Sequence, residues 1–174
     1  FGVLVMFATA DQLVSDILPF VLPPERISVQ DAAEQYMLLK GGGGLAPWKP
    51  YKTPYMLEPM NCMTSRLYTS VDFMGCARSG KTEALLKALV CHAVKCDPSD
   101  VLIVHMNQNE SEYFSKTEIS PMLQAHKELR ICLSNIARDN NVGYIRLKAG
   151  NVIKLAWPTD ATFRGKSFKY VLIP

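Results

Sequence analysis

Residues 75–82 read Gly-Cys-Ala-Arg-Ser-Gly-Lys-Thr, a complete G-x-x-x-x-G-K-[ST] phosphate-binding motif. Glycine lets the backbone turn tightly enough for successive N–H groups to face a phosphate chain. In such loops the lysine, here Lys81, reaches the β- and γ-phosphates, and the final hydroxyl, here that of Thr82, is a ligand for Mg²⁺. The motif therefore predicts a nucleotide site. Its predicted contacts are Gly75, Cys76, Ala77, Arg78, Ser79, Gly80, Lys81 and Thr82.

The segments on either side of the loop have the strand–loop–helix order that the motif requires. Before it, residues 71–74 form a short, mostly apolar run that suits a buried strand. After it, residues 81–95 predict one helix, in which Glu83 precedes Lys87 in the favourable order for a surface ion pair. The positive end of that helix would face the phosphates. The alternative is a glycine-containing turn that binds no ligand.

The composition is that of a folded globular chain. With 174 residues, 48% of them hydrophobic, the chain suits one domain with a sizeable core. The net charge of +3 permits contact with nucleic acid but does not argue for it. The five cysteines include no C-x-x-C pair, so the sequence predicts a reducing compartment and neither a disulfide framework nor a zinc site. Cys76 is interpreted as a small filler in the loop.

Both ends of the sequence indicate a fragment of a longer protein. The chain starts at Phe1, and its apolar residues 1–8 are too few to span a bilayer and carry no positive leader. Residues 170–174 stop inside what reads as a buried strand. We therefore expect parts of the fold, and of the active site, to lie outside this chain.

Several segments before the loop carry turn and cap signals. Ser28, with Asp31 three residues on, resembles a capping box and predicts a helix over residues 29–40. The four glycines at 41–44 predict a flexible linker. A second phosphate loop is the alternative there, but no Lys-Ser/Thr follows. Pro54, at the first position after Thr53, predicts a short helix that ends near residue 63.

The segments after the loop alternate between strands and helices. Apolar runs of the kind seen at 101–106 suit a parallel sheet, and alternating patterns suit a hairpin. The predicted elements are a strand at 101–106, helices at 107–115 and 121–134, a β-hairpin at 144–148 and 152–157, a basic loop at 163–169, and a strand from Tyr170.

The order of these features resembles the ATPase domain of the large terminase subunit of tailed phages, in its lambda-like, GpA-type branch. The resemblance runs from about residue 18 to the C-terminus. It rests on the short helix at Pro54-Tyr55, the loop, the strand at 101–106, the segment 111–116, the hairpin, and Arg164-Gly165-Lys166 before an apolar strand.

The resemblance implies an α/β fold: a P-loop NTPase of the additional-strand, helicase- and terminase-like type with a parallel core sheet. Residues 1–46 would be a helical lead-in with its glycine linker, and residues 47–174 a partial ATPase domain. In the family the strand after the hairpin ends in the acidic pair of the Walker B motif. That pair would follow Pro174, so this chain alone is expected to be a poor ATPase.

The same resemblance implies a motor that uses ATP and Mg²⁺ to drive double-stranded DNA into an empty procapsid. The implied partners are the DNA, a small terminase subunit, the portal protein of the procapsid, and further copies of the same chain. The implied compartment is the host cytoplasm, with no membrane contact. A nuclease would lie further along the parent protein.

Individual roles carry over from the family only at matching positions. Lys81 would be catalytic, neutralising charge on the γ-phosphoryl group. Arg78 would act as an arginine finger within the chain, or else pack on the outside of the loop. Tyr55 or Trp48 would stack on adenine, with ordinary packing as the alternative for each. Three basic residues, Arg164, Lys166 and Lys169, would touch DNA phosphates or form a solvated loop. His92 and His105 are interpreted as structural.

Other readings of the loop remain open. One is a different P-loop enzyme, such as a helicase-like ATPase or a small-molecule kinase, although no arginine cluster typical of a kinase lid follows Thr82. Another is a nucleotide-binding piece without turnover.

Overall fold

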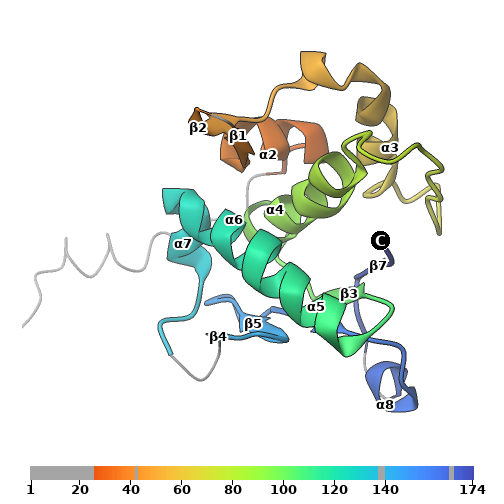
Figure 1. Cartoon of the computed structure of the whole chain (residues 1–174), viewed down its shortest axis with the longest axis vertical. Coiled ribbons are helices and arrows are strands. Elements are labelled where there is room, and N and C mark those ends of the chain that lie inside the picture. The colour runs from red at the N-terminus through yellow and green to blue at the C-terminus, as the bar shows by residue number, and fades with distance from the viewer. Residues whose placement is uncertain (1–25, 42, 137–139, 165–166) are drawn as a thin grey trace, which may run out of the picture.

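The chain folds as a mixed α/β structure in which helices pack on a five-stranded sheet (Figure 1). The computed structural model describes residues 26–41, 43–136, 140–164 and 167–174. Residues 1–25 of the predicted helical lead-in lie outside these described residues. No helix in the described ranges is long and apolar enough to cross a membrane.

The main sheet combines parallel and antiparallel pairs in the order β4-β5-β6-β3-β7. Strand β3 lies between β6 and β7 and is parallel to both, while β4, β5 and β6 are joined antiparallel. At the centre, Ile103 is in register with Leu155 on one side and Leu172 on the other. The predicted hairpin and the strand from Tyr170 are thus confirmed. The bounds are Val101–Val104 (β3), Asn140–Asn141 (β4), Tyr144–Arg146 (β5), Val152–Ala156 (β6) and Tyr170–Leu172 (β7).

The two faces of β3 pack against different layers, because successive strand residues point to opposite sides. Val101 and Ile103 belong to the large core beneath the helices, whereas Leu102 and Val104 form a small cluster with Ala156 on the other face. All four β3 residues are buried. A central strand buried on both faces explains the uninterrupted apolar run in the sequence.

The helix after the phosphate-binding loop runs through the middle of the helical layer. It begins as a wide π-helical turn, η3 (Thr82–Lys87), and continues as α4 (Ala88–Lys95). Every residue from Ala88 to Val94 is buried, because α2 (Val29–Tyr36) packs along one side of α4 and the next helices along another (Figure 1). The predicted helix over residues 81–95 is confirmed, and its first turn is wider than a regular α-helix.

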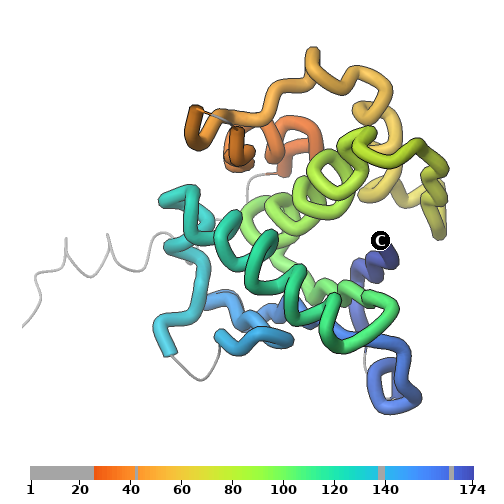
Figure 2. Tube along the Cα trace, in the orientation of Figure 1, coloured from red at the N-terminus to blue at the C-terminus, as the bar shows by residue number. Residues whose placement is uncertain are grey.

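A second run of helical segments follows β3 and crosses the α4 layer. Asn107 caps it, its side chain accepting a hydrogen bond from the N–H of Glu110 at 2.8 Å. The single helix predicted over residues 121–134 is wrong, because His126 adopts an extended conformation (φ −97°, ψ 128°) and divides it (Figure 2). The segments are α5 (Gln108–Phe114), the π-helical η4 (Ser115–Ile119), α6 (Ser120–Ala125) and α7 (Lys127–Cys132).

The two ends of the glycine tract, Gly41 and Gly44, belong to paired strands and not to a linker between separate elements. Ser28 caps α2 as predicted, but the helix ends at Tyr36. Strands β1 (Leu38–Gly41) and β2 (Gly44–Pro47) then pair antiparallel. Gly44 has φ +116°, a conformation that glycine adopts readily, and it pairs with Gly41 at the end of the two strands. The predicted helix over residues 29–40 is therefore too long, because its last residues pair with the chain that follows.

The chain between this hairpin and the loop is built from short helical turns. Pro54 begins a helical segment as predicted, although the Thr53 side chain makes no capping hydrogen bond. The turns are η1 (Pro50–Lys52), η2 (Pro54–Met56) and α3 (Leu57–Cys62). A last short helix, α8 (Asp160–Phe163), lies between β6 and β7.

The strand predicted at residues 71–74 is wrong. These residues pair with no strand, and Met74 is 99% exposed. Residues 68–71 instead form one wall of a groove whose other wall is residues 169–172, which include β7. An apolar run forms a strand only where it pairs with a neighbour, and no described strand forms a ladder with this segment.

Candidate nucleotide site at the phosphate-binding loop

Two loop residues adopt left-handed backbone conformations. Arg78 has φ +61° and Gly80 has φ +83°. Left-handed residues alternating with right-handed ones turn successive N–H groups toward one concavity, which is an anion-binding arrangement. Among the described residues, Arg78 is the only one other than glycine with positive φ. Because that conformation is unfavourable for an L-residue by about 1–2 kcal/mol, the loop holds Arg78 under strain.

Gly75 is required by the close approach of its neighbours. A β-carbon at this position would lie 2.7 Å from the Phe73 ring and 3.1 Å from Ser79 Oγ, so any larger residue would have to displace the Phe73 ring. The Phe73 side chain is partly buried against the main core. The first glycine of the motif is thus wedged between the core and the crest of the loop.

Lys81 closes the loop from its far end. Its Nζ donates a hydrogen bond to the carbonyl oxygen of Gly75 at 2.6 Å. The ammonium therefore reaches back from the end of the loop to its first residue. A cation held at this point is placed to neutralise phosphate oxygens that the N–H groups contact.

Thr82 begins the wide helical turn, and its side chain is exposed. A hydroxyl oxygen is a hard donor of the kind that Mg²⁺ prefers. The described residues contain no group of three or more His, Cys, Asp or Glu that could hold a metal ion. Mg²⁺ commonly takes one or two protein oxygens and completes its shell with phosphates and water, so Thr82 fits that role.

The short helical turn before the loop contacts it directly. The Tyr55 hydroxyl donates a hydrogen bond to the Ser79 carbonyl at 2.9 Å, and the Tyr55 side chain remains 56% exposed. The Thr53 methyl group lies 3.7 Å from where a β-carbon on Gly80 would be. Trp48, the other predicted stacking residue, is 2% exposed and packs in the core. Stacking of Trp48 on adenine is therefore wrong, and ordinary packing is confirmed for it.

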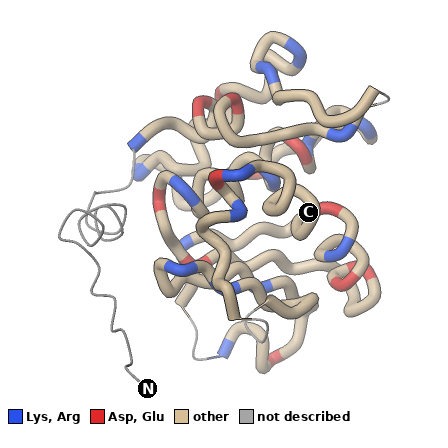
Figure 3. The backbone as a smooth tube through the Cα atoms, turned by 90° about the vertical axis from the view of Figure 1, so that its left-hand side faces the viewer, with Lys and Arg blue, Asp and Glu red and all other residues tan. Residues whose placement is uncertain are grey.

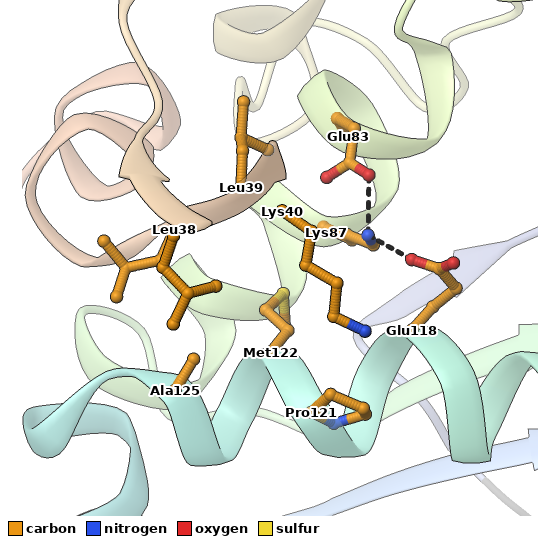
Figure 4. A pocket seen from close by; sticks show the side chains of 10 residues that line it. Leu38, Leu39, Lys40, Glu83, Lys87, Glu118, Pro121, Met122 and Ala125 are labelled. Atoms are coloured by element: carbon orange, nitrogen blue, oxygen red, sulfur yellow. Dashed lines mark hydrogen bonds and ion pairs between the residues drawn. The ribbon is translucent and has the colours of Figure 1, made fainter. Parts of the chain in front are cut away.

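Lys87 is more buried than the sequence suggested. The predicted pair with Glu83 is present at 2.6 Å, but Lys87 is only 7% exposed and also contacts the Glu118 carboxylate (Figure 4). Burial lowers the pKa of Lys87, but the hydrogen bonds with Glu118 and Glu83 outweigh it and raise that pKa above its usual value. The sequence missed Glu118, because no local pattern connects it with the loop helix.

Two basic residues of the loop before β7 form ion pairs within the chain. Lys169 pairs with Asp97, which also accepts a hydrogen bond from the Tyr170 hydroxyl at 2.8 Å. Arg164 pairs with Asp160 at 3.3 Å on an exposed surface. Lys166 lies outside the described residues. Figure 3 shows Lys and Arg interspersed with Asp and Glu along the described part of the backbone.

Two histidines are structural, as predicted. His92 lies on α4, 6% exposed, with Nε2 3.0 Å from the Ile27 carbonyl oxygen, and burial lowers its pKa. His105 follows β3 and packs on the Phe114 ring with centroids 4.6 Å apart, and burial lowers its pKa too. All five cysteines are free thiols, in agreement with the sequence analysis.

The fold combines a mixed β-sheet with a helix that packs on it and that directly follows a glycine-containing loop. This arrangement defines a nucleotide-binding domain of the P-loop-like class. The chain belongs to the family of the ATPase domain of the phage terminase large subunit gpA, whose family model matches residues 43–174. The resemblance seen in the sequence is thereby confirmed.

Among curated proteins, the chain is similar to the terminase large subunit of Enterobacteria phage P21. The two are 25% identical over 144 residues, which is 81% of this chain and 22% of that protein. The chain thus spans about a fifth of the length of the curated relative it matches (22%).

Proposed function

We propose that this chain is the ATPase part of a DNA-packaging motor, which couples ATP hydrolysis to the movement of double-stranded DNA into a procapsid. The observation that carries the proposal is the loop itself: Lys81 bonds back to Gly75 across a loop in which Arg78 and Gly80 are left-handed. Membership of the terminase ATPase family supports ATP as the nucleotide.

The loop residues divide the work by position. The backbone N–H groups of residues 75–82 would hold the phosphates, and Lys81 would exchange its bond to Gly75 for the β- and γ-phosphate oxygens. Thr82 would hold Mg²⁺, which supplies charge neutralisation between the β- and γ-phosphates. Arg78, exposed at the crest of the loop, would contact the γ-phosphate as charge develops on it.

Two further contacts belong to the same proposal. Tyr55 would offer its exposed ring to adenine while its hydroxyl stays on the loop. Arg164, Lys166 and Lys169 would position DNA through its phosphates, without reading its sequence. Because Lys169 is paired with Asp97, it would have to give up that partner to contact DNA. The wider partners would be a small terminase subunit, the portal of the procapsid and further copies of the chain, in the host cytoplasm.

The test is Lys81→Ala in the full-length protein. We expect ATP hydrolysis to fall by a factor of roughly 10²–10³, since single contacts to developing charge are worth about that much. Lys127→Ala is the matched control, because Lys127 is an exposed lysine at the start of α7. Near wild-type turnover by Lys81→Ala would refute the assignment. Turnover that double-stranded DNA fails to stimulate would refute the coupling to DNA.

A further inference from the structure

Lys87 is buried at a junction between the loop helix and the next helical layer. Among the described residues, it is the only buried lysine or arginine. Its ammonium is paired on two sides, with Glu83 Oε1 at 2.6 Å and with the Glu118 carboxylate (Figure 4). Both carboxylate side chains are 37% exposed, so the ammonium is the inner member of the triad.

The pair between Lys87 and Glu83 brackets an unusual turn. The π-helical segment η3 spans Thr82–Lys87, so Lys87 is its last residue and Glu83 directly follows the candidate magnesium ligand. A π-helical turn is rare, and it persists where surrounding contacts favour it over a regular α-helix. The ion pair supplies such a contact across the turn that carries Thr82.

The pair between Lys87 and Glu118 fixes this turn against a second one. Glu118 belongs to η4, which is also π-helical, in the run of helices that follows β3. The β1–β2 hairpin also contacts η4, because Lys40 Nζ donates a hydrogen bond to the Thr117 carbonyl at 3.2 Å. A cavity of about 310 Å³ lies beside the triad, and Leu38, Leu39 and Met122 are among the residues that line it (Figure 4).

Stability alone is a weak explanation for such an arrangement. Removing a lysine from water opposes the attraction of its partners, so a buried ion pair is often no more stabilising than apolar residues of similar volume. Six of the ten residues that line the cavity are apolar, so a methionine could pack there without a charge. The charges add a geometric constraint, because Lys87 can pair with both carboxylates only if the two π-helical turns keep their present positions.

We propose that Lys87 is a positioning residue: through Glu83 and Glu118 it holds the wide turn Thr82–Lys87, and with it the Thr82 hydroxyl and the adjoining loop amides, in their phosphate-binding arrangement. This inference rests on the proposed nucleotide site and adds a residue that touches neither nucleotide nor metal. Lys87 acts through the helical turn, whereas Lys81 acts on the phosphates.

The test compares two ways of removing the charge. Lys87→Met keeps the length of the side chain, and the triple variant Glu83→Gln, Lys87→Met, Glu118→Gln also removes the carboxylates left behind. Lys95→Met is the matched control, because Lys95 lies on the same helix and pairs with Glu128 at 3.2 Å, farther from the loop. Lys87→Arg is the rescue, since a guanidinium can bond both carboxylates.

Two measurements on the full-length protein decide the matter. The first is amide hydrogen exchange of residues 80–84 without ligand, which should be several-fold faster in both Lys87→Met variants and unchanged in Lys95→Met. The second is the Kd for ADP with and without Mg²⁺. Because indirect supports of a metal ligand are typically worth 10–100-fold, we expect the Mg²⁺-dependent tightening to fall by about tenfold, with Lys87→Arg restoring most of it.

Unchanged loop exchange and unchanged Mg²⁺-dependent affinity, with only a lower melting temperature, would overturn the positioning role. A wild-type protein that binds no nucleotide would overturn the proposed function instead. Even then, the exchange measurement still decides whether Lys87 holds the turn.

Discussion

The Tyr55 hydroxyl donates a hydrogen bond to the backbone carbonyl of Ser79 over 2.9 Å, which ties the short helix before the loop to the crest of the loop. The bond uses only the edge of the phenol, and the side chain stays 56% exposed. One side chain can therefore anchor the loop with its hydroxyl and contact a base with its ring. Different substitutions separate the two roles.

Tyr55→Phe keeps the ring and removes the anchor. We expect it to lower the free energy of unfolding by about 0.5–1.5 kcal/mol, the usual net value of one hydrogen bond, with little change in the Kd for ATP. Tyr55→Ala should weaken ATP binding by about tenfold, because stacking of a base on an aromatic ring is worth about 1–3 kcal/mol. Tyr51→Ala is the control, since Tyr51 is a nearby tyrosine that is 74% exposed. Equal ATP affinity in Tyr55→Ala and wild type would exclude stacking.

Arg78 should separate turnover from binding. If its guanidinium reaches the γ-phosphate only in the transition state, Arg78→Ala should lower kcat by about 10³-fold or more and leave the Kd for ATP nearly intact. Arg78→Lys should rescue little, because a lysine lacks the planar fork. Steady-state kinetics and equilibrium binding on the full-length protein check this. An alanine variant with unchanged kcat eliminates the finger role.

Arg78→Gly adds a second measure of the same position. Glycine adopts φ +61° without strain, so this variant should be more stable than Arg78→Ala. The expected difference in unfolding free energy is about 1 kcal/mol. Thermal or urea denaturation of the two variants measures it. Equal stability would indicate that the left-handed conformation is not kept when Arg78 is replaced.

The stability of the fold should fall as the pH drops below about 6.5, the ordinary pKa of histidine. Burial lowers the pKa of His92 and of His105 in the folded state, so the unfolded chain binds their protons first. A second proton on His92 would sit on Nδ1, which is buried without a hydrogen-bond partner in the described structure. His92→Gln, which keeps an N–H for the Ile27 carbonyl, should flatten the pH dependence.

Urea unfolding at pH 7.5 and 5.5 measures this pH effect. The charged neighbours of His92, Asp97 and Lys169, act in opposite directions on its pKa, and burial is the larger influence. The pKa of Asp97 is itself lowered, because its hydrogen bonds with Lys169 and Tyr170 outweigh burial, so its contribution is lost only at more acidic pH. Wild-type stability that is equal or higher at pH 5.5 would contradict the prediction.

Tyr170→Phe should loosen the start of β7. Its hydroxyl bonds the Asp97 carboxylate at 2.8 Å and joins the strand to the end of the loop helix. We expect a loss of about 1–2 kcal/mol in the free energy of unfolding, because the acceptor is charged. Tyr144→Phe, on β5, is the control, since Tyr144 is 39% exposed. Urea denaturation of both variants checks this, and equal losses would contradict a specific role for the Asp97 contact.

The sequence predicts best what local pattern determines. The helix after the loop and β3 are marked by residues within a few positions of one another, and both were predicted within a few residues of their observed bounds. The loop is recognised from the spacing of its residues alone. Each of its glycines has a local reason: Gly75 lies too close to its neighbours for a side chain, and Gly80 has a left-handed backbone conformation. The roles assigned to the loop residues remain predictions.

What the sequence missed depends on partners far along the chain. Residues 71–74 read as a strand, yet a strand needs a neighbour, and no local pattern specifies one. The glycine tract at 41–44 reads as a flexible linker, and only the pairing of β1 with β2, which no local pattern specifies, shows that its ends belong to a hairpin. Lys87 reads as half of a surface pair, because Glu118 lies on another helix.

The outer edge of β7 has a consequence for handling the protein. Within the described part of the chain, β7 pairs only with β3; Val171, which lines the groove, is 51% exposed, and Ile173, just after the strand, is 78% exposed. An apolar strand edge with free N–H and C=O groups invites pairing with another chain. We therefore expect the 174-residue chain to self-associate and precipitate as its concentration rises. Val171→Lys, which places a charge at that edge, should keep the purified protein in solution for longer.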